Sequence, residues 1–343
     1  MVNIGVIGCG HWGPNLVRNF VELPDVELKV LCDLDENKVK SLKKYYPSVN
    51  TVTDYKEILD NKEIDAVAIA TPAKSHYALA RECLLAGKHI LVEKPLALSS
   101  SEGADLLQLS EKYKKVLMVG HTFLYNPAIR ELKKYIKSKE IGDIYYIFSQ
   151  RLNLGQIRRD VNAMWNFAPH DISIILHLID EIPIRVNAKG LSCLHSDNED
   201  IVFLNLDFKS GINAHIHISW LDPVKVRRMV VVGSKKMIVY DDISADSKIQ
   251  IYDKGVDKIN NSKNAQGLGS FAEFQLKLRS GDIHIPRIDF YEPLKEECAH
   301  FIDCIKNKRV PLTDGKHGLM VVKILEVANN SIKQAGAPIN FTT

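Results

Sequence analysis

Several features of secreted, membrane and nucleic-acid-binding proteins are missing from this sequence of 343 residues. No apolar run reaches the roughly 18 residues that a membrane-spanning helix needs. Lysine and arginine number 45 against 42 aspartates and glutamates, which is too balanced for a protein that binds nucleic acid through a basic face. The amino-terminal residues carry no charged segment ahead of an apolar one, as a signal peptide would. We therefore expect a cytoplasmic protein with neither a membrane nor a nucleic-acid partner.

Cysteine is scarce and scattered. The six cysteines form no C-x-x-C pair, and their spacing does not match that of a zinc site. Most stand in apolar runs, as Cys32 does after Val30 and Leu31. We therefore expect reduced, buried thiols, with no disulfide framework and no bound metal.

The composition that is present is that of an ordinary globular protein, with 45% hydrophobic, 25% charged and 8% aromatic residues. Its length indicates two domains, at roughly 100 to 200 residues per domain. The hydrophobic pattern changes after residue 121, so we predict domains at residues 1–121 and 122–343, with the closing helices able to pack back on the first.

The first predicted domain alternates short apolar runs with longer amphipathic ones. This pattern predicts a parallel sheet covered by helices on both faces. The expected strands are residues 4–7, 26–32, 65–70, 90–92 and 116–119, and the expected helices are residues 12–21, 37–45, 75–86 and 101–112.

The second predicted domain has strands that follow one another closely, several of them alternating apolar and polar residues. Such strands predict an α+β domain with a large, open, mostly antiparallel sheet. The expected strands are residues 143–152, 185–193, 201–208, 212–219, 228–233, 236–240 and 248–252, and the expected helices are residues 126–138, 171–178, 293–306 and 317–333. Residues 255–285 are polar without apolar periodicity, and we expect a long loop there.

A glycine-rich turn connects the first strand to the first helix. Gly8-Cys9-Gly10-His11-Trp12-Gly13 matches G-x-G-x-x-G in the strand-turn-helix context that a dinucleotide site requires. The first glycine allows the tight turn, the second lets the backbone approach a pyrophosphate, and the third lets the helix pack closely. The amino terminus of the helix then attracts the anion.

An acidic residue stands where such a site needs one. Asp33 ends the second expected strand, twenty residues after Gly13, where a carboxylate accepts hydrogen bonds from the ribose hydroxyls. The same carboxylate repels a 2′-phosphate, so the sequence favours NAD over NADP. The alternative, a glycine turn without a ligand, explains the turn but not Asp33.

Polar residues follow two further strands of this sheet. Thr71, Pro72 and His76 follow one strand, at the edge where ligands bind in open α/β sheets. Glu93 and Lys94, with Pro95 after them, end another. Lys94 could polarise a hydroxyl or pass a proton, and bound NAD⁺ would lower its pKa. The structural alternatives are a solvated histidine at a helix start and a solvated lysine.

The second domain carries one unusual stretch, from Ala163 to Asp171. Pro169 suits the first turn of a helix, which would place His170 and Asp171 at a helix amino terminus. A neutral imidazole there can act as a general base. The alternative is an N-cap aspartate beside a structural histidine. Upstream, the charged residues 158–160 either clamp a phosphate or carboxylate or form a solvated turn.

These motifs together resemble the Gfo/Idh/MocA oxidoreductases, in order and spacing along the whole chain. The residues that carry the resemblance are Gly8–Gly13, Asp33, Thr71-Pro72 with His76, Glu93-Lys94-Pro95, Gly120-His121 with Asn126-Pro127, and His170-Asp171. The resemblance implies an NAD(P)-binding Rossmann domain and a sheet-rich second domain. It also implies hydride transfer at a sugar or cyclitol carbinol, in homodimers or homotetramers formed through those sheets.

The resemblance assigns roles residue by residue. Lys94 and His170 match the family's catalytic pair. Many members have an aspartate four residues before that histidine, and here Asn166, which cannot transfer a proton, stands instead. The expected cofactor residues are Gly8, Cys9, Gly10, His11, Trp12, Gly13, Asp33, Thr71, Pro72, His76, Glu93 and Lys94, and the expected substrate residues are Lys94, His121, Asn126, Arg159, Trp165, Asn166, His170 and Asp171.

The run from Arg158 to Asp171 is similar to the branch of the family that acts on nucleotide-linked amino sugars. It implies oxidation at C3 of a UDP-linked N-acetylamino sugar. A ketoreductase or a cyclitol dehydrogenase of the same family would have the same residues, so the substrate and the direction stay open. A non-catalytic NAD-binding regulator is the rival from another class, and it would have no need of Lys94 and His170 together.

Overall fold

The computed structural model describes residues 1–155, 157–159, 161–194, 198–260 and 274–341. The chain divides into two compact units. The first comprises residues 1–126, 172–174 and 290–330, and the second comprises residues 127–171, 175–289 and 331–343. Two long helices, α7 (Ala163–Ile179) and α9 (Gly315–Lys333), contribute residues to both.

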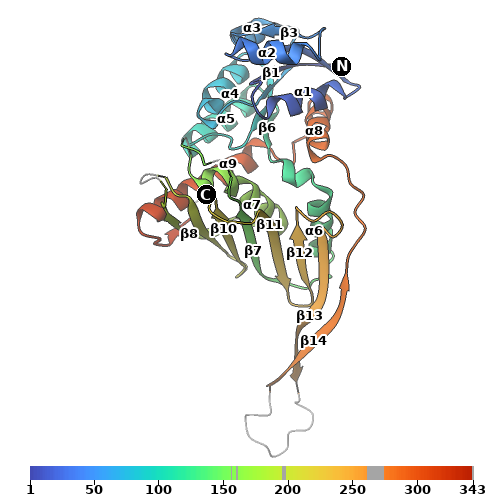
Figure 1. Cartoon of the computed structure of the whole chain (residues 1–343), viewed down its shortest axis with the longest axis vertical. Helices are drawn as coiled ribbons and strands as arrows, with labels where there is room; N and C mark the ends of the chain where they lie inside the picture. The colour runs from blue at the N-terminus through green and yellow to red at the C-terminus, as the bar shows by residue number, and fades with distance from the viewer. Residues whose placement is uncertain (156, 160, 195–197, 261–273, 342–343) are drawn as a thin grey trace, which may run out of the picture. The chain divides into compact units, whose positions relative to one another are not determined.

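A six-stranded parallel sheet in the order β3-β2-β1-β4-β5-β6 forms the core of the first unit (Figure 1). This is the strand order of a Rossmann fold. The strands are β1 (Val2–Ile7), β2 (Val26–Cys32), β3 (Asn50–Val52), β4 (Ala66–Ile69), β5 (His89–Glu93) and β6 (Leu117–Gly120). The helices are α1 (Gly13–Val21), α2 (Glu36–Lys43), α3 (Lys56–Asp60), α4 (His76–Leu85) and α5 (Ser100–Lys112), with the 3₁₀ turns η1 (Ala73–Ser75) and η2 (Thr122–Tyr125).

The strands of this sheet are largely apolar, because helices cover both of its faces. All four residues of β4 and of β6 are buried. Parallel pairing brings the carboxyl ends of all six strands to one edge of the sheet. The loops that leave these ends are therefore neighbours, although they are far apart in the sequence.

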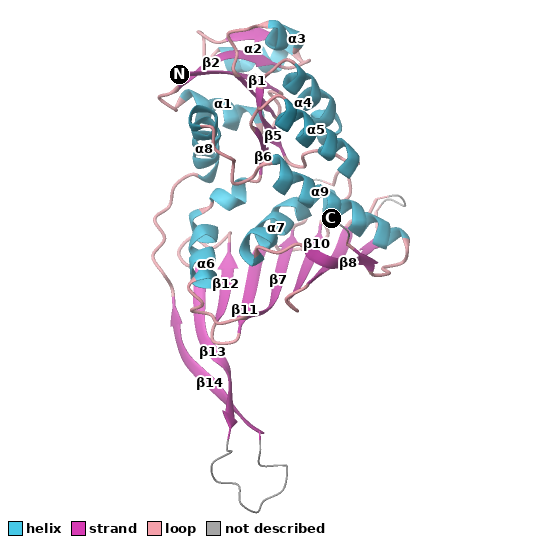
Figure 2. Ribbon diagram, turned by 180° about the vertical axis from the view of Figure 1, so that it is seen from behind, coloured by secondary structure: helices cyan, strands magenta, loops and turns pink. Residues whose placement is uncertain are grey.

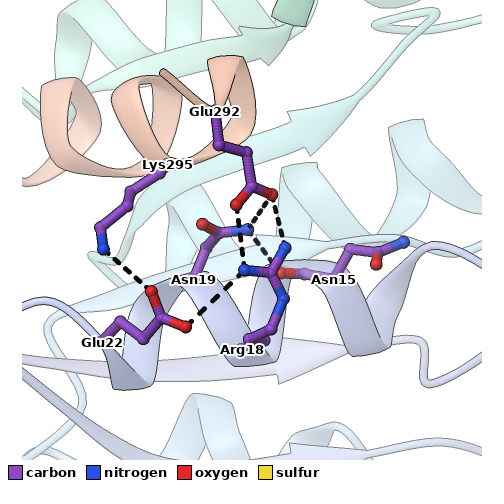
Figure 3. Close-up of polar contacts among 6 residues, drawn as sticks. All are labelled: Asn15, Arg18, Asn19, Glu22, Glu292 and Lys295. Atoms are coloured by element: carbon purple, nitrogen blue, oxygen red, sulfur yellow. Dashed lines mark hydrogen bonds and ion pairs between the residues drawn. The ribbon is translucent and has the colours of Figure 1, made fainter. Parts of the chain in front are cut away.

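A late segment of the chain completes the first unit. Helix α8 (Pro293–Asn307) packs on α1 and on η2. Arg18 of α1 donates to both carboxylate oxygens of Glu292, at 3.0 and 2.5 Å, and Lys295 donates to Glu22 at 2.9 Å (Figure 3). Exposed ion pairs of this kind stabilise little individually. As a group they fix the amino-terminal end of α8 against α1.

A nine-stranded sheet forms the second unit, in the order β14-β13-β12-β11-β7-β10-β9-β8-β15 (Figure 2). All neighbouring pairs are antiparallel except β10 with β7. The strands are β7 (Ile144–Leu152), β8 (Pro183–Leu191), β9 (Ile201–Phe208), β10 (Asn213–Ser219), β11 (Val226–Gly233), β12 (Met237–Asp241), β13 (Ile249–Asn260), β14 (Phe274–His284) and β15 (Ile339–Asn340). The predicted fold class, a Rossmann domain followed by an open, mostly antiparallel sheet, is confirmed.

The two faces of the nine-stranded sheet differ. Ile147, Leu204 and Ile216 are fully buried on one face, and α6 (Pro127–Lys137) and α7 belong to this unit's helical layer (Figure 2). Phe203 and His215 alternate with the buried residues and are half-buried on the other face. The alternation confirms the period-2 pattern of the sequence.

The prediction of a long loop over residues 255–285 is wrong. Strand β13 continues to Asn260 and pairs with β14 from Ile251 to Asn260. Beyond Tyr252 the two strands pair with each other and no longer with β12. In this extension Val256 is 48% exposed and Leu278 is 81% exposed, so its apolar residues do not mark a buried face. Residues 261–273 lie outside the described residues.

The prediction of a short helix at residues 171–178 is also wrong at its amino terminus. Helix α7 begins at Ala163, where the Asn162 side chain caps it by accepting the Trp165 amide at 2.9 Å. Pro169 therefore lies inside the helix. A proline there removes one backbone hydrogen bond, which is why the sequence indicated a helix start. Within the described residues, no helix is long and apolar enough to span a bilayer.

Candidate active site

The glycine loop after β1 has the geometry that its motif predicts. Gly8 has φ +98°, and a Cβ there would stand 2.7 Å from the carbonyl of Ala70. A Cβ on Gly13 would collide with the Gly8 carbonyl oxygen. Gly10 by contrast faces open space, with nothing within 4 Å of its built Cβ. The first and third glycines are thus required by the fold, while the second leaves room for a ligand to approach the backbone.

Asp33 is fastened to this loop. Its Oδ2 accepts the Cys9 amide at 2.8 Å, and its Oδ1 accepts the Asp35 amide at 2.9 Å. Lys38 Nζ lies 3.6 Å from the same Oδ1. A carboxylate offers about four acceptor sites in all, so these contacts do not use up its capacity. The Asp33 carboxylate is therefore oriented beside the loop and still able to receive two ribose hydroxyls.

These residues fit a dinucleotide. The open approach at Gly10, the α1 amino terminus and the oriented Asp33 supply the pyrophosphate and ribose contacts that NAD requires.

His76 ties together the loops after β4 and β5. Its side chain is 1% exposed, and its ring nitrogens lie 2.8 Å from the Thr71 carbonyl and 2.7 Å from the Pro95 carbonyl. Burial lowers the pKa of His76, so the neutral ring donates to one carbonyl at a time. Both nitrogens are engaged with the protein. The role that this geometry gives His76 is to hold the two loops in place.

Glu93 and Lys94 end β5 on the same sheet edge. Burial raises the pKa of the Glu93 carboxyl to about 7. The Lys94 charge, the Lys94 amide and the Trp12 side chain act in the opposite direction and lower this pKa. The Lys94 amide donates to Glu93 Oε2 at 3.3 Å, and the Lys94–Pro95 peptide is cis. The two side chains thus place a carboxyl group and an amine directly beyond the end of β5.

His121 follows β6 on this edge and is 1% exposed. Its ring lies edge-on to that of His317, 5.3 Å away, and His317 Nε2 lies 2.8 Å from the Ser173 hydroxyl. Burial, with His317 and Lys94 nearby, lowers the pKa of His121 well below its usual range, so the ring is neutral. Asn126, which precedes α6, is buried as well.

The second unit positions the predicted residues of α7. Its Asp171 is buried against the sheet, where Oδ1 accepts the Ser149 hydroxyl at 2.7 Å and Oδ2 accepts Arg151 Nε at 2.6 Å. This pairing fixes the rotation of α7 about its axis and hence the direction of the neighbouring His170. A substrate contact by Asp171 stays a prediction, and its carboxylate already has these two partners.

His170 lies in the middle of α7, because the helix starts at Ala163. The positive end of the helix therefore does not assist it, since that effect falls off within the first turn. His170, Trp165 and Asn166 are half-buried, and Arg159 is exposed before the helix. Asp160, the third residue of the predicted anion clamp, lies outside the described residues. Their roles toward a substrate stay predictions.

Sequence reasoning missed the residues that support these groups. Ser149 and Arg151 occupy inward positions of β7, and a charged residue at an inward position of an alternating strand was the available signal. Lys133 donates to the His177 carbonyl and to Asp180 at the end of α7, both at 2.5 Å. Such distant pairings leave no local trace in the sequence.

Comparison with known proteins identifies the family. Residues 2–121 match the oxidoreductase family with an NAD-binding Rossmann fold, and residues 129–239 match the GFO/IDH/MocA C-terminal domain. The chain belongs to the Gfo/Idh/MocA oxidoreductases. It is therefore an NAD-binding enzyme of a family that includes sugar and cyclitol dehydrogenases.

Individual relatives are distant but extend along the whole chain. The uncharacterized oxidoreductase YrbE of Bacillus subtilis is 24% identical over 98% of this chain and 96% of its own. UDP-N-acetylglucosamine 3-dehydrogenase of Acidithiobacillus ferrooxidans is 24% identical over 89% of this chain and 93% of its own, and its structure superimposes with a TM-score of 0.79 over 97% and 98% of the chains. GenD2 from gentamicin A biosynthesis, solved in complex with NAD, has a TM-score of 0.82 at 18% identity, over 100% and 97%.

The Asp33 geometry predicts cofactor choice. Asp33→Ala removes the ribose acceptor and the charge that repels a 2′-phosphate, so we expect weaker NAD⁺ binding and a smaller preference over NADP⁺. Titration calorimetry with each cofactor measures both. Glu36→Ala, at an exposed position in the first turn of α2, is the matched control and should bind NAD⁺ like the wild type. Tighter binding of NADP⁺ than of NAD⁺ by the wild type would contradict this role of Asp33.

Proposed function

We propose that this protein oxidises the C3 hydroxyl of a UDP-linked N-acetylamino sugar, with NAD⁺ as the acceptor. The observation that carries the proposal is the position of Lys94 at the carboxyl end of β5. Parallel pairing puts that end on the same sheet edge as the glycine loop and Asp33. A lysine amine adjacent to a dinucleotide site is suited to accept the proton of the hydroxyl whose carbon gives up its hydride.

Each side chain has a separate task in this proposal. Bound NAD⁺ supplies the hydride acceptor. Lys94 and His170 share one task, the removal of the hydroxyl proton, which lets the carbon give up its hydride. Asn166 orients the substrate as a hydrogen-bonding group and is not an acid or base in the reaction, since an amide side chain does not ionise near neutral pH. Trp165 packs on a sugar or base, and Arg159 meets the diphosphate.

The substrate class rests on two observations. The run from Arg158 to Asp171 resembles enzymes of nucleotide-linked amino sugars, and a full-length relative is a UDP-N-acetylglucosamine 3-dehydrogenase. Identity of 24% supports the fold and the chemistry more strongly than the sugar. Oxidation and reduction use the same residues, so a ketoreductase acting on the corresponding keto sugar is the alternative direction.

A substrate screen tests the proposal. Purified protein is mixed with NAD⁺ and a panel of UDP-sugars, free sugars and cyclitols, and NADH formation is followed by absorbance with mass spectrometry of the product. We expect UDP-N-acetylglucosamine or a close relative to give the 3-keto product. Turnover of a cyclitol alone would overturn the nucleotide-sugar assignment, and NAD⁺ binding without turnover of any alcohol or keto sugar would favour the regulator.

The shared task of Lys94 and His170 makes a kinetic prediction. Lys94→Ala and His170→Ala should each lower kcat by about 10²–10⁴-fold, the usual size of an acid–base contribution. Their losses should not add, because they serve one proton transfer. The NAD⁺ affinity should change little. Lys112→Ala, at an exposed position at the end of α5, is the control and should turn over like the wild type. Near-wild-type turnover of both single variants would contradict the assignment of Lys94 and His170 to the proton transfer.

The open face of the nine-stranded sheet leads us to propose a homodimer or homotetramer formed through sheet contacts. Phe148 and Phe203 stack on His215 there, and their ring centroids lie 5.4 and 6.4 Å, respectively, from that of the His215 ring. Half-buried aromatic rings on a sheet face are typical of an association surface. Light scattering at micromolar concentration should give two or four chains, and Phe148→Asp should shift the mass toward one. A wild-type monomer would refute this assembly.

A further inference from the structure

Glu297 of α8 is a fully buried acid that the reaction described above does not use. Its side chain is 0% exposed, and neither carboxyl oxygen has a hydrogen bond of good geometry among the described residues, although the Thr122 hydroxyl is near enough to act on the carboxyl. An isolated carboxylate in such a place is strongly disfavoured relative to the protonated acid. Buried polar groups without partners are rare, so the position calls for a physical explanation.

The negative charge of Glu93 acts on the carboxyl of Glu297. Helix α8 packs on η2, which follows Gly120 at the end of β6. A Cβ on Gly120 would stand 3.0 Å from Glu93 Oε1, so the missing side chain makes room for the Glu93 carboxyl there. The groups that act on Glu297 at this place are the Thr122 hydroxyl and the charge of Glu93.

The surroundings treat the two acids differently. Glu93 has Lys94, a backbone amide and the Trp12 side chain to stabilise its anion. Glu297 has burial and the negative charge of Glu93, which both raise its pKa well above the usual range, and only the Thr122 hydroxyl opposes them. When the surroundings make the pKa values of two acids differ in this way, one acid can ionise while the other stays neutral.

The other charged groups around α8 lie elsewhere on the helix or beside Lys94. Arg18 and Glu22 of α1 pair with Glu292 and Lys295 at its amino-terminal end, and Lys306 pairs with Asp25 near the other (Figure 3 shows the first set). Along α8 itself the titratable neighbours are Cys298 and His300, and beyond η2 they are His121 and His317. Of these groups and Glu93, the charge that acts on Glu297 is that of Glu93.

We propose that Glu297 keeps its proton in the working protein and is a positioning residue, because as a neutral acid it leaves Glu93 as the one carboxylate charge beside Lys94. The proposal rests on the proposed role of Lys94. A second carboxylate would hold the proton of Lys94 more tightly and oppose its function as a proton acceptor. Ionisation of Glu297 at alkaline pH should therefore end activity.

Thermal unfolding of the protein without substrate tests the proton on Glu297. The folded wild type binds this proton more tightly than the unfolded chain, whose reference pKa is 4.5. The proton therefore stabilises the folded wild type, and this stabilisation is lost as pH rises from 4.5 toward the raised pKa of Glu297. The Glu297→Gln variant has no such proton to lose. The Tm of Glu297→Gln minus that of the wild type should grow between pH 5 and 9. Glu296→Gln, one residue earlier on the helix, should show no such trend. A difference that is flat or falls with pH would overturn the proposal.

The pH profile of kcat/KM tests the link to Lys94. Glu297→Gln should stay within about threefold of the wild type at pH 7, far less than the 10²–10⁴-fold of a lost acid–base group. Its alkaline limb should move to higher pH by half a unit or more. A loss of more than tenfold at pH 7 would mean that Glu297 works as an anion, and an unmoved limb would mean a structural role only. Either result overturns the positioning role.

Infrared spectroscopy of the wild type covers the case in which the variant does not fold. A protonated carboxyl has a C=O band distinct from those of carboxylates, and we expect one buried acid band to persist at pH 8. Its absence would overturn the proposal without any variant. If the sugar screen finds no turnover, the proposed function fails while unfolding and infrared spectra still decide whether Glu297 is protonated.

Discussion

Parallel pairing in the first unit is the constraint on which the candidate site depends. Because β1, β2, β4, β5 and β6 run the same way, the glycine loop, Asp33, Thr71, Lys94 and His121 leave the sheet at one edge. Parallel strands require helical crossovers, and the helices cover both faces of the sheet. The same constraint makes the strands apolar and leaves their carboxyl ends as the places where polar groups can gather.

Pairing of charges then decides what each polar group can do. Asp33 keeps acceptor capacity after binding two amides, whereas Asp171 is held by Ser149 and Arg151 beneath α7. Both are aspartates in the motifs singled out from the sequence, yet the first has acceptor sites left beside the glycine loop and the second fixes a helix. In the same way Glu93 has cationic and donor partners, while Glu297 has burial and a like charge. The sequence names these residues without distinguishing their environments.

Local patterns were sufficient to predict five of the six strands of the first sheet and most of the second unit, but not β3 or α3. Strand β9 was predicted at its observed bounds, because its alternation follows directly from one buried face. The predictions failed where tertiary contacts override local signals. Pro169 indicated a helix start but lies inside α7, which Asn162 caps earlier. Strands β13 and β14 pair with each other beyond Tyr252, where Val256 and Leu278 are exposed, so an apolar residue there does not mark a buried face. The sequence did not single out Glu297, because its environment depends on a strand that lies about two hundred residues earlier.

The central claim is that this chain moves a hydride from a sugar carbon to NAD⁺ with Lys94 and His170 serving one proton transfer. The most direct measurement uses UDP-N-acetylglucosamine carrying deuterium at C3, with the NADH analysed by NMR and mass spectrometry. The account predicts that the label appears at C4 of the nicotinamide, with slower turnover than for unlabelled sugar. It also predicts that the variant with both Lys94→Ala and His170→Ala transfers the label about 10²–10⁴-fold more slowly than the wild type, much like the slower single variant. Unlabelled NADH, or label transfer by the double variant at close to the wild-type rate, would contradict it.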